Sequence, residues 1–141
     1  MATIAVKPII LNDITLIIGA DNYEAAVSRV VLTPTVPQAK WKGMTPAAIF
    51  NLAGTPEWVC EVTWAQDHET ANSLSQYSIA NAGQVKAVEF KPKKPVSPAT
   101  APTFKCDVLI LPGAIGGDLD TVPTASASWP VNGQPARTVA A

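Results

Sequence analysis

Few residues in this 141-residue chain could do chemistry: one histidine, two cysteines and one glycine-rich stretch. His68 lies between Asp67 and Glu69, and adjacent residues point in different directions on a helix, so this trio does not have metal-ligand spacing. Cys60 and Cys106 both fall on apolar faces, whereas a reactive thiol needs a polar, partly exposed setting. We therefore expect neither a metal centre nor a Cys–His nucleophile. Two buried free thiols are the expected state, with a Cys60–Cys106 disulfide as the alternative.

The glycine-rich stretch 113–117, Gly-Ala-Ile-Gly-Gly, follows a strand-like segment and could in principle cradle a phosphate. It lacks the glycine order of a dinucleotide-binding loop and the Lys-Ser/Thr ending of a P-loop. Asp118 and Asp120 follow it and would repel a phosphate. We interpret the stretch as a turn between two strands. Since no acid, base and nucleophile converge, we expect no enzyme and no cofactor.

The overall composition points to one globular domain rather than to a nucleic-acid binder. The formal net charge is -1, and 48% of the residues are hydrophobic. A protein that grips DNA by its phosphates usually carries a basic surplus, which is missing here. We find no secretory signal, and the longest apolar run is far shorter than the ~20 residues of a membrane span, so we expect synthesis in the cytoplasm.

Apolar and polar residues alternate along most of the segments that would position these residues. This period of two is the period of β-strands. Alternation is clearest at 57–65, where Trp58, Cys60, Val62 and Trp64 share one side. Asp67 and Gly83 bracket a stretch without Gly or Pro that predicts one helix over 67–82, with Asp67 as its cap and Gly83 at positive φ. The other predicted strands are 14–18, 23–33 (ending at Pro34), 85–91, 104–110 and 124–131.

These elements predict a mainly β fold, a β-sandwich or open barrel flanked by one α-helix, as a single domain over 1–141. Residues 1–12 and 132–141 are predicted to be flexible N-terminal and C-terminal arms. Two proline-rich connections, Thr33–Pro46 and Lys91–Pro102, are predicted to be exposed loops.

The surface charges segregate along the chain. Residues 57–69 contain four acidic residues and no Lys or Arg, whereas residues 86–105 contain five lysines and one glutamate. These are either two solvated faces or patches that meet on neighbouring copies. Trp41, between Lys40 and Lys42, poses a similar choice, because a tryptophan in a loop either folds back on the core or anchors an interface.

Several stretches together resemble the major tail tube proteins of siphophages, especially those of actinobacterial phages. They are LTPTVPQAKWKG, TPEWVCEVTWAQDHETANSLSQYSIANAGQ, VKAVEFKPKK, VLILPGAIGGDLDT and ASASWPVNGQPA. The order of the pieces carries the likeness, which covers about residues 23–136.

The resemblance implies a virion protein whose hexameric rings stack into a tube through which DNA leaves the capsid. Its implied partners are further copies of itself, a tape-measure protein, tail terminator and baseplate proteins, and DNA that passes without tight binding. In this family the loop after the second strand and the two arms commonly make ring-to-ring contacts. By position the resemblance assigns such contacts to Thr33–Thr45, including Lys40, Trp41 and Lys42. The alternatives are another phage ring component, such as a connector or baseplate ring, and a stand-alone immunoglobulin-like binding module.

Overall fold

The computed structural model describes residues 2–6, 8–11, 13–92 and 102–139. Most of the predicted Lys-Pro loop, with Lys93 and Lys94, lies outside these residues, as do positions 1, 7, 12, 140 and 141 of the two predicted arms. Nine strands and one helix make up the described part: β1 (Thr15–Ile18), β2 (Asp21–Asn22), β3 (Val27–Thr35), β4 (Gln38–Lys42), β5 (Ile49–Ala53), β6 (Glu57–Ala65), α1 (Leu74–Ala80), β7 (Val85–Lys91), β8 (Pro102–Leu109) and β9 (Thr124–Val139).

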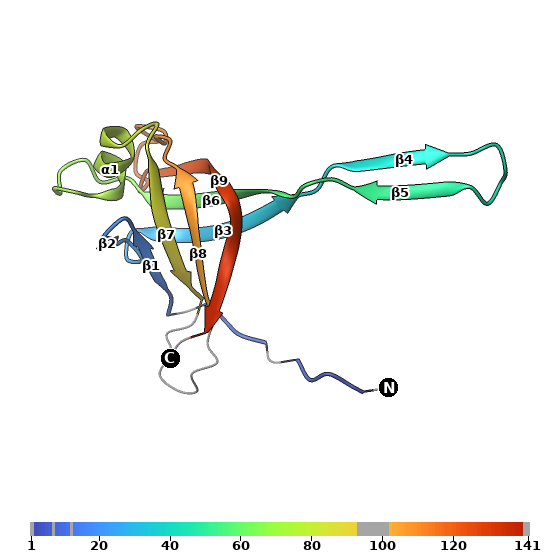
Figure 1. Ribbon diagram of the computed structural model, residues 1–141. Helices are drawn as coiled ribbons and strands as arrows, with labels where there is room; N and C mark the ends of the chain where they lie inside the picture. Colours follow the sequence, from blue (N-terminus) through green and yellow to red (C-terminus); the bar gives the residue numbers. More distant parts are fainter. Residues whose placement is uncertain (1, 7, 12, 93–101, 140–141) are drawn as a thin grey trace.

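Seven of the strands form one antiparallel sheet in the order β2-β1-β7-β8-β9-β6-β3, which confirms the mainly β prediction. The long strand β9 joins two halves, since its first part pairs with β6 and its later part pairs with β8. The sheet curves around a shared interior with α1 at one end (Figure 1). Strands β1 and β3 pair with β7 and β6 but not with each other, so the barrel is open between them.

The core lies inside this curve and is centred on two tryptophans. Trp64 of β6 and Trp129 of β9 are almost fully buried, with ring centroids 6.0 Å apart. Each indole N–H is satisfied: Trp64 Nε1 donates to Ser75 Oγ (3.1 Å) and Trp129 Nε1 donates to the Leu111 carbonyl (2.8 Å). Burial of the bulky indoles therefore leaves neither donor unpaired. The side that Cys60, Val62 and Trp64 were predicted to share in strand 57–65 faces this core.

The predicted helix over 67–82 is too long, because α1 covers only Leu74–Ala80. Asp67 Oδ1 instead accepts from the backbone N–H groups of Glu69 (3.0 Å) and Thr70 (3.1 Å), which closes a separate turn. Ser73 is the actual N-cap, since its Oγ accepts from Gln76 N (3.4 Å). Side chains that bond to nearby backbone groups compete with helix formation, which explains the late start. The predicted positive φ at Gly83 is confirmed, at 84°.

The predicted C-terminal arm is wrong for the residues that the structure describes, because β9 continues through Val139 and pairs with β8. The register shifts between Lys105 and Asp107 of β8, opposite the stretch that contains Gly133 and Pro135. Gly133 has a φ of 86°, which glycine adopts without strain. Gly and Pro, which indicated an arm, here occupy a bulge where the ladder is already interrupted, so the strand passes through them.

The predicted strand over 23–33 is shifted. Tyr23 is buried beside Tyr77 in a turn, and β3 runs from Val27 through Pro34 to Thr35. Pro34 does not end the strand, because β3 is the last strand of the sheet and an edge strand tolerates a residue without an N–H donor. No helix of the described residues is long and apolar enough to cross a membrane.

Candidate functional site

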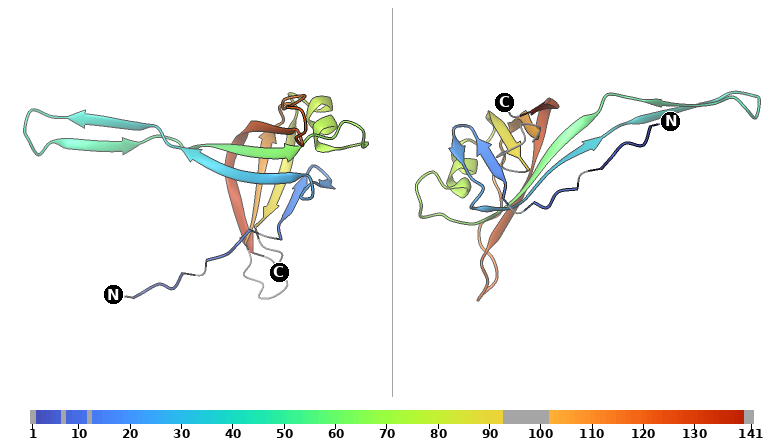
Figure 2. Two further views of the ribbon diagram at one scale, coloured as in Figure 1. Left: turned by 180° about the vertical axis from the view of Figure 1, so that it is seen from behind. Right: turned by 90° about the horizontal axis from the view of Figure 1, so that it is seen from below.

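A two-stranded hairpin projects far beyond the sheet (Figures 1 and 2). Strands β4 and β5 pair with each other in their own antiparallel sheet, and neither joins the seven-stranded sheet. The predicted loop over Thr33–Pro46 is therefore wrong in part: its first residues belong to β3, and residues 38–42 are β4. Strand β5 was not predicted at all. Phe50 and Leu52, separated by Asn51, were the available signal.

Backbone hydrogen bonds close the hairpin at both ends. Gly43 N donates to the Ala48 carbonyl near the tip, and Gly54 N donates to the Pro37 carbonyl at the base, both at 2.7 Å. An added Cβ on Gly43 would lie 2.7 Å from the Ala48 Cβ, so the close approach of the strands favours glycine there. The two glycines thus mark the limits of the paired segment.

The register gives the hairpin two different faces. Trp41 pairs with Phe50 and Ala39 pairs with Leu52, while Lys40 pairs with Asn51. Since successive residues of a strand point to opposite sides, Trp41, Phe50, Ala39 and Leu52 share one side. We call this side the apolar face of the hairpin. The opposite side carries Lys40 and Lys42, together with Gln38, Asn51, Ile49 and Ala53.

The apolar face is uncovered. Trp41 is 65% exposed, Phe50 55% and Leu52 62%. Trp41 is therefore not folded back on the core, and of the two readings left open by the sequence the core reading is wrong. Contiguous exposed apolar side chains of this size mark interaction surfaces in soluble proteins. An isolated two-stranded hairpin is at best marginally stable in water, so a contact that covers this face would also stabilise the hairpin.

Lys40, Trp41 and Lys42 are the contact residues that the resemblance assigns. All three lie on the short strand β4, but they point to two different sides of the hairpin. Trp41 belongs to the apolar face, whereas Lys40 and Lys42 flank it from the other side. Residues 33–56 contain these two lysines and no Asp or Glu. The hairpin therefore presents a cationic side and an apolar side, and an apolar partner surface fits the second of these.

The body of the domain also has an uncovered apolar surface. A groove of about 470 Å³ is lined by residues of β3, β6, β7, β8 and β9, among them Leu32, Trp58, Phe90, Phe104 and Arg137. The Trp58 Nε1 atom is buried but has no hydrogen-bond partner among the described residues. A buried donor without a partner is costly, so a contact that supplies an acceptor would stabilise the groove.

The predicted charge patches are partly neutralised within the chain. Glu61 accepts a hydrogen bond from Arg29 Nη1 at 3.0 Å, and Asp67 is held in its turn by two backbone N–H groups. On the basic side, Lys91 lies 3.7 Å from Glu89. Surface ion pairs of this kind contribute little to stability, and they leave less charge for contacts between copies than the sequence indicated.

The two cysteines and the histidine that could do chemistry have the following surroundings in the structure. Cys60 and Cys106 are free cysteines, and burial raises the pKa of the Cys60 thiol to about 12 and that of Cys106 to about 11. A thiol with so high a pKa is protonated at neutral pH and is a poor nucleophile. His68 is exposed, and its Nε2 lies 3.4 Å from Gln66 Oε1. The described residues contain no group of three or more His, Cys, Asp or Glu that could hold a metal.

The glycine-rich stretch 113–117 lies in a connection between β8 and β9, and its first residue, Gly113, packs on the core. An added Cβ on Gly113 would lie 2.7 Å from the Trp64 ring. The Gly116 N–H donates to Gln66 Oε1 (2.8 Å), and Gln66 Nε2 donates back to the Gly116 carbonyl (2.9 Å). The amide that a phosphate would need at Gly116 is thus already occupied.

No family model matches the chain, and no curated protein matches it at a significant level.

Proposed function

We propose that this protein is a structural virion subunit, the major tail tube protein of a long non-contractile-tailed bacteriophage. In this proposal, six copies close into a ring and rings stack into a tube that conducts DNA during ejection. The observation that carries the proposal is the hairpin β4–β5, whose apolar face with Trp41, Phe50 and Leu52 has no cover from its own chain among the described residues.

A second copy is the partner that fits this surface best. The hairpin offers an apolar ridge, and the body of the same chain offers an apolar groove about 470 Å³ in volume. Two different patches that complement each other make a heterologous contact, which produces rings or filaments rather than a simple twofold dimer. Such contacts are what a ring-and-tube protein needs.

The charge of the chain supports a conduit for DNA rather than a DNA clamp. The formal net charge is -1, and affinity for phosphates depends on a surplus of Lys and Arg. A tube lined by such subunits lets DNA pass without holding it. The proposal assigns no catalysis to the chain, and it names as further partners a tape-measure protein and the tail terminator and baseplate proteins.

Negative-stain electron microscopy of the purified protein over a range of concentrations tests the proposal. Stacked rings with sixfold symmetry, or regular tubes, are the expected result. Rings that never stack would favour a connector or baseplate ring. Protein that stays monomeric at every concentration, also when a tail-tip complex is supplied as initiator, would contradict the proposal and favour a stand-alone binding module.

A further inference from the structure

The connection between β8 and β9 contains a loop whose two ends are held by one side chain. Gln66 Nε2 donates to the carbonyls of Gly116 and Thr124, both at 2.9 Å, and Gln66 Oε1 accepts from Gly116 N at 2.8 Å. The backbone N–H of Gln66 also donates to the Pro123 carbonyl at 3.0 Å. We call residues 116–124 the Gln66 loop. Because its ends are fixed to one residue, its tip projects as a defined surface feature.

The tip of the Gln66 loop exposes apolar side chains between carboxylates. Leu119 is 89% exposed and Val122 is 75% exposed. Asp118 and Asp120 flank Leu119 in the chain, and Thr121 Oγ1 donates to the Asp118 carbonyl at 2.7 Å, which closes the turn. The two aliphatic side chains contribute nothing to the core, and neighbouring exposed apolar side chains mark interaction surfaces.

Two isoleucines add apolar surface beside the base of the Gln66 loop. Ile115 is 72% exposed, Ile79 of α1 is 47% exposed, and both line one small pocket together with His68. We call Ile79, Ile115, Leu119 and Val122 the α1-end patch. The helix α1 lies on the side of the barrel opposite to the projecting hairpin (Figures 1 and 2). The patch is separate from the hairpin and from the 470 Å³ groove, since it shares no residue with either.

The chain segments that carry the α1-end patch are acidic. Segments 66–84 and 111–124 contain no Lys or Arg. They contain four exposed carboxylates, which are those of Asp67, Glu69, Asp118 and Asp120. Carboxylates repel phosphate groups, so nucleic acids and anionic lipid headgroups do not fit this surface. They attract Lys and Arg, so a partner that is apolar and cationic fits it.

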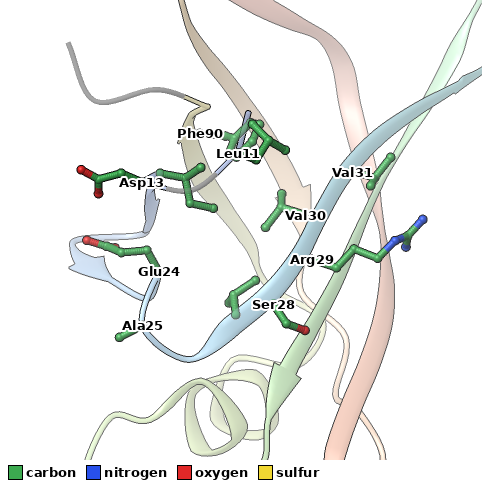
Figure 3. A pocket seen from close by; sticks show the side chains of 11 residues that line it. Leu11, Asp13, Glu24, Ala25, Ser28, Arg29, Val30, Val31 and Phe90 are labelled. Atoms are coloured by element: carbon green, nitrogen blue, oxygen red, sulfur yellow. The ribbon is translucent and has the colours of Figure 1, made fainter. Parts of the chain in front are cut away.

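The other apolar surfaces of the domain have a different charge or have cover from the chain itself. The apolar face of the hairpin lies in a segment that contains Lys40 and Lys42 and no carboxylate. The cleft of about 420 Å³ in Figure 3 is lined by the chain's own Leu11 and by side chains of both signs, Glu24 and Arg29. The α1-end patch differs from both, because it is uncovered among the described residues and its charge has one sign.

We propose that the α1-end patch docks a Lys- or Arg-rich amphipathic helix of a different protein. Apolar residues at i, i+3, i+4 and i+7 give such a helix a stripe that lies on an apolar surface. Its cationic residues flank the stripe and meet the carboxylates, which sets the orientation of the helix. The hairpin of a second copy is also apolar and cationic, but a ridge needs a groove, whereas the Gln66 loop projects. This contact goes beyond the proposed assembly and does not depend on it.

A synthetic helix tests the proposal. The probe is a fluorescein-labelled peptide of about 18 residues, composed of Leu and Lys with one apolar stripe and long enough to form a helix. It is titrated with the full-length protein, at concentrations where the protein is monomeric, and followed by fluorescence anisotropy. We expect saturable binding that weakens about tenfold at about 1 M sodium chloride, where the Debye length is about 3 Å. Equal binding of a scrambled peptide without the stripe would overturn the proposal.

Two double variants locate the contact on the protein. L119S/V122S should weaken binding of the probe about tenfold, since it removes the apolar tip of the Gln66 loop. D118N/D120N should weaken it about threefold and reduce its salt dependence, since it removes two negative charges. All four side chains are exposed, so the melting temperatures should not change. Parent-like binding of the probe by L119S/V122S would contradict the proposal.

The matched control is I4S/V6S. Ile4 is 86% exposed and Val6 is 85% exposed, but residues 2–11 contain no Asp or Glu. This variant should bind the probe as the parent does, and an equal loss of binding would show that the probe does not recognise the patch. A peptide of residues 36–55 that displaces the probe would assign the patch to the hairpin of a second copy and would also overturn the proposal. Neither result bears on ring formation by the parent, which electron microscopy measures separately.

Discussion

Replacing Trp41 with alanine should separate folding from assembly. Trp41 is 65% exposed and lies on a hairpin outside the seven-stranded sheet, so its loss removes little packing from the free protein. An indole side chain presents roughly 250 Å². The exposed part is then ~160 Å², which at ~25 cal/mol per Å² corresponds to ~4 kcal/mol if a partner covers it completely.

Alanine keeps a small part of this contact, and interfaces rarely cover a side chain completely. We therefore expect Trp41→Ala to weaken each contact by about 3 kcal/mol, which lowers the association constant about a hundredfold. The concentration at which rings or tubes appear should rise accordingly in a sedimentation-velocity series. The melting curve of the monomer, followed by far-ultraviolet circular dichroism, should remain cooperative with an unchanged midpoint.

Leu119→Ala is the matched control, because Leu119 is 89% exposed but lies in the connection before β9, far from the hairpin in sequence and fold. It should change neither the melt nor the assembly concentration. The reasoning is refuted if Trp41→Ala abolishes the cooperative melt, since Trp41 would then be part of the core. It is also refuted if Trp41→Ala assembles at the same concentration as the control.

Three further predictions concern the fold. Gly113→Ala should lower the free energy of unfolding by about 1–3 kcal/mol in urea titrations, because its Cβ would meet the buried Trp64 ring at 2.7 Å; unchanged stability would show that the connection shifts freely. Ser73→Ala should cost about 1 kcal/mol in the same assay, since it removes the cap of α1, and an effect below ~0.3 kcal/mol would contradict that role. Burial raises the pKa of both thiols, to about 12 for Cys60 and about 11 for Cys106, so the native state keeps protons that the unfolded state releases above about pH 9. Stability should therefore be full below pH 9. Above pH 9 it should fall by up to ~1.4 kcal/mol per pH unit for the Cys60 thiol, until about pH 12, and by less for the partly exposed Cys106 thiol, where solvent screens the effect. The slope should be shallower in Cys60→Ala; equal slopes in the two proteins would refute this.

The amino-acid sequence by itself determined those strands in which apolar and polar side chains alternate from one residue to the next. The predicted ranges 57–65 and 85–91 match β6 and β7, because alternation along one strand is a local property that burial of one face imposes. The inward set on β6, with Cys60, Val62 and Trp64, followed for the same reason. The positive φ of Gly83 was likewise readable from its place after a run of helix-compatible residues.

Only the tertiary structure decided which segments pair over long distances. Strand β5 exists because it meets β4, and its weak alternation gave no sign of that partner. The end of β9 is a strand because β8 lies beside it, which outweighs the local preference of Gly133 and Pro135 for turns. The free edge of β3 and the exposure of Trp41 are likewise consequences of which strands close the sheet and which project from it. A residue's own chemistry sets its preference for strand or turn, but the neighbour that satisfies its backbone and covers its side chain is a property of the whole fold.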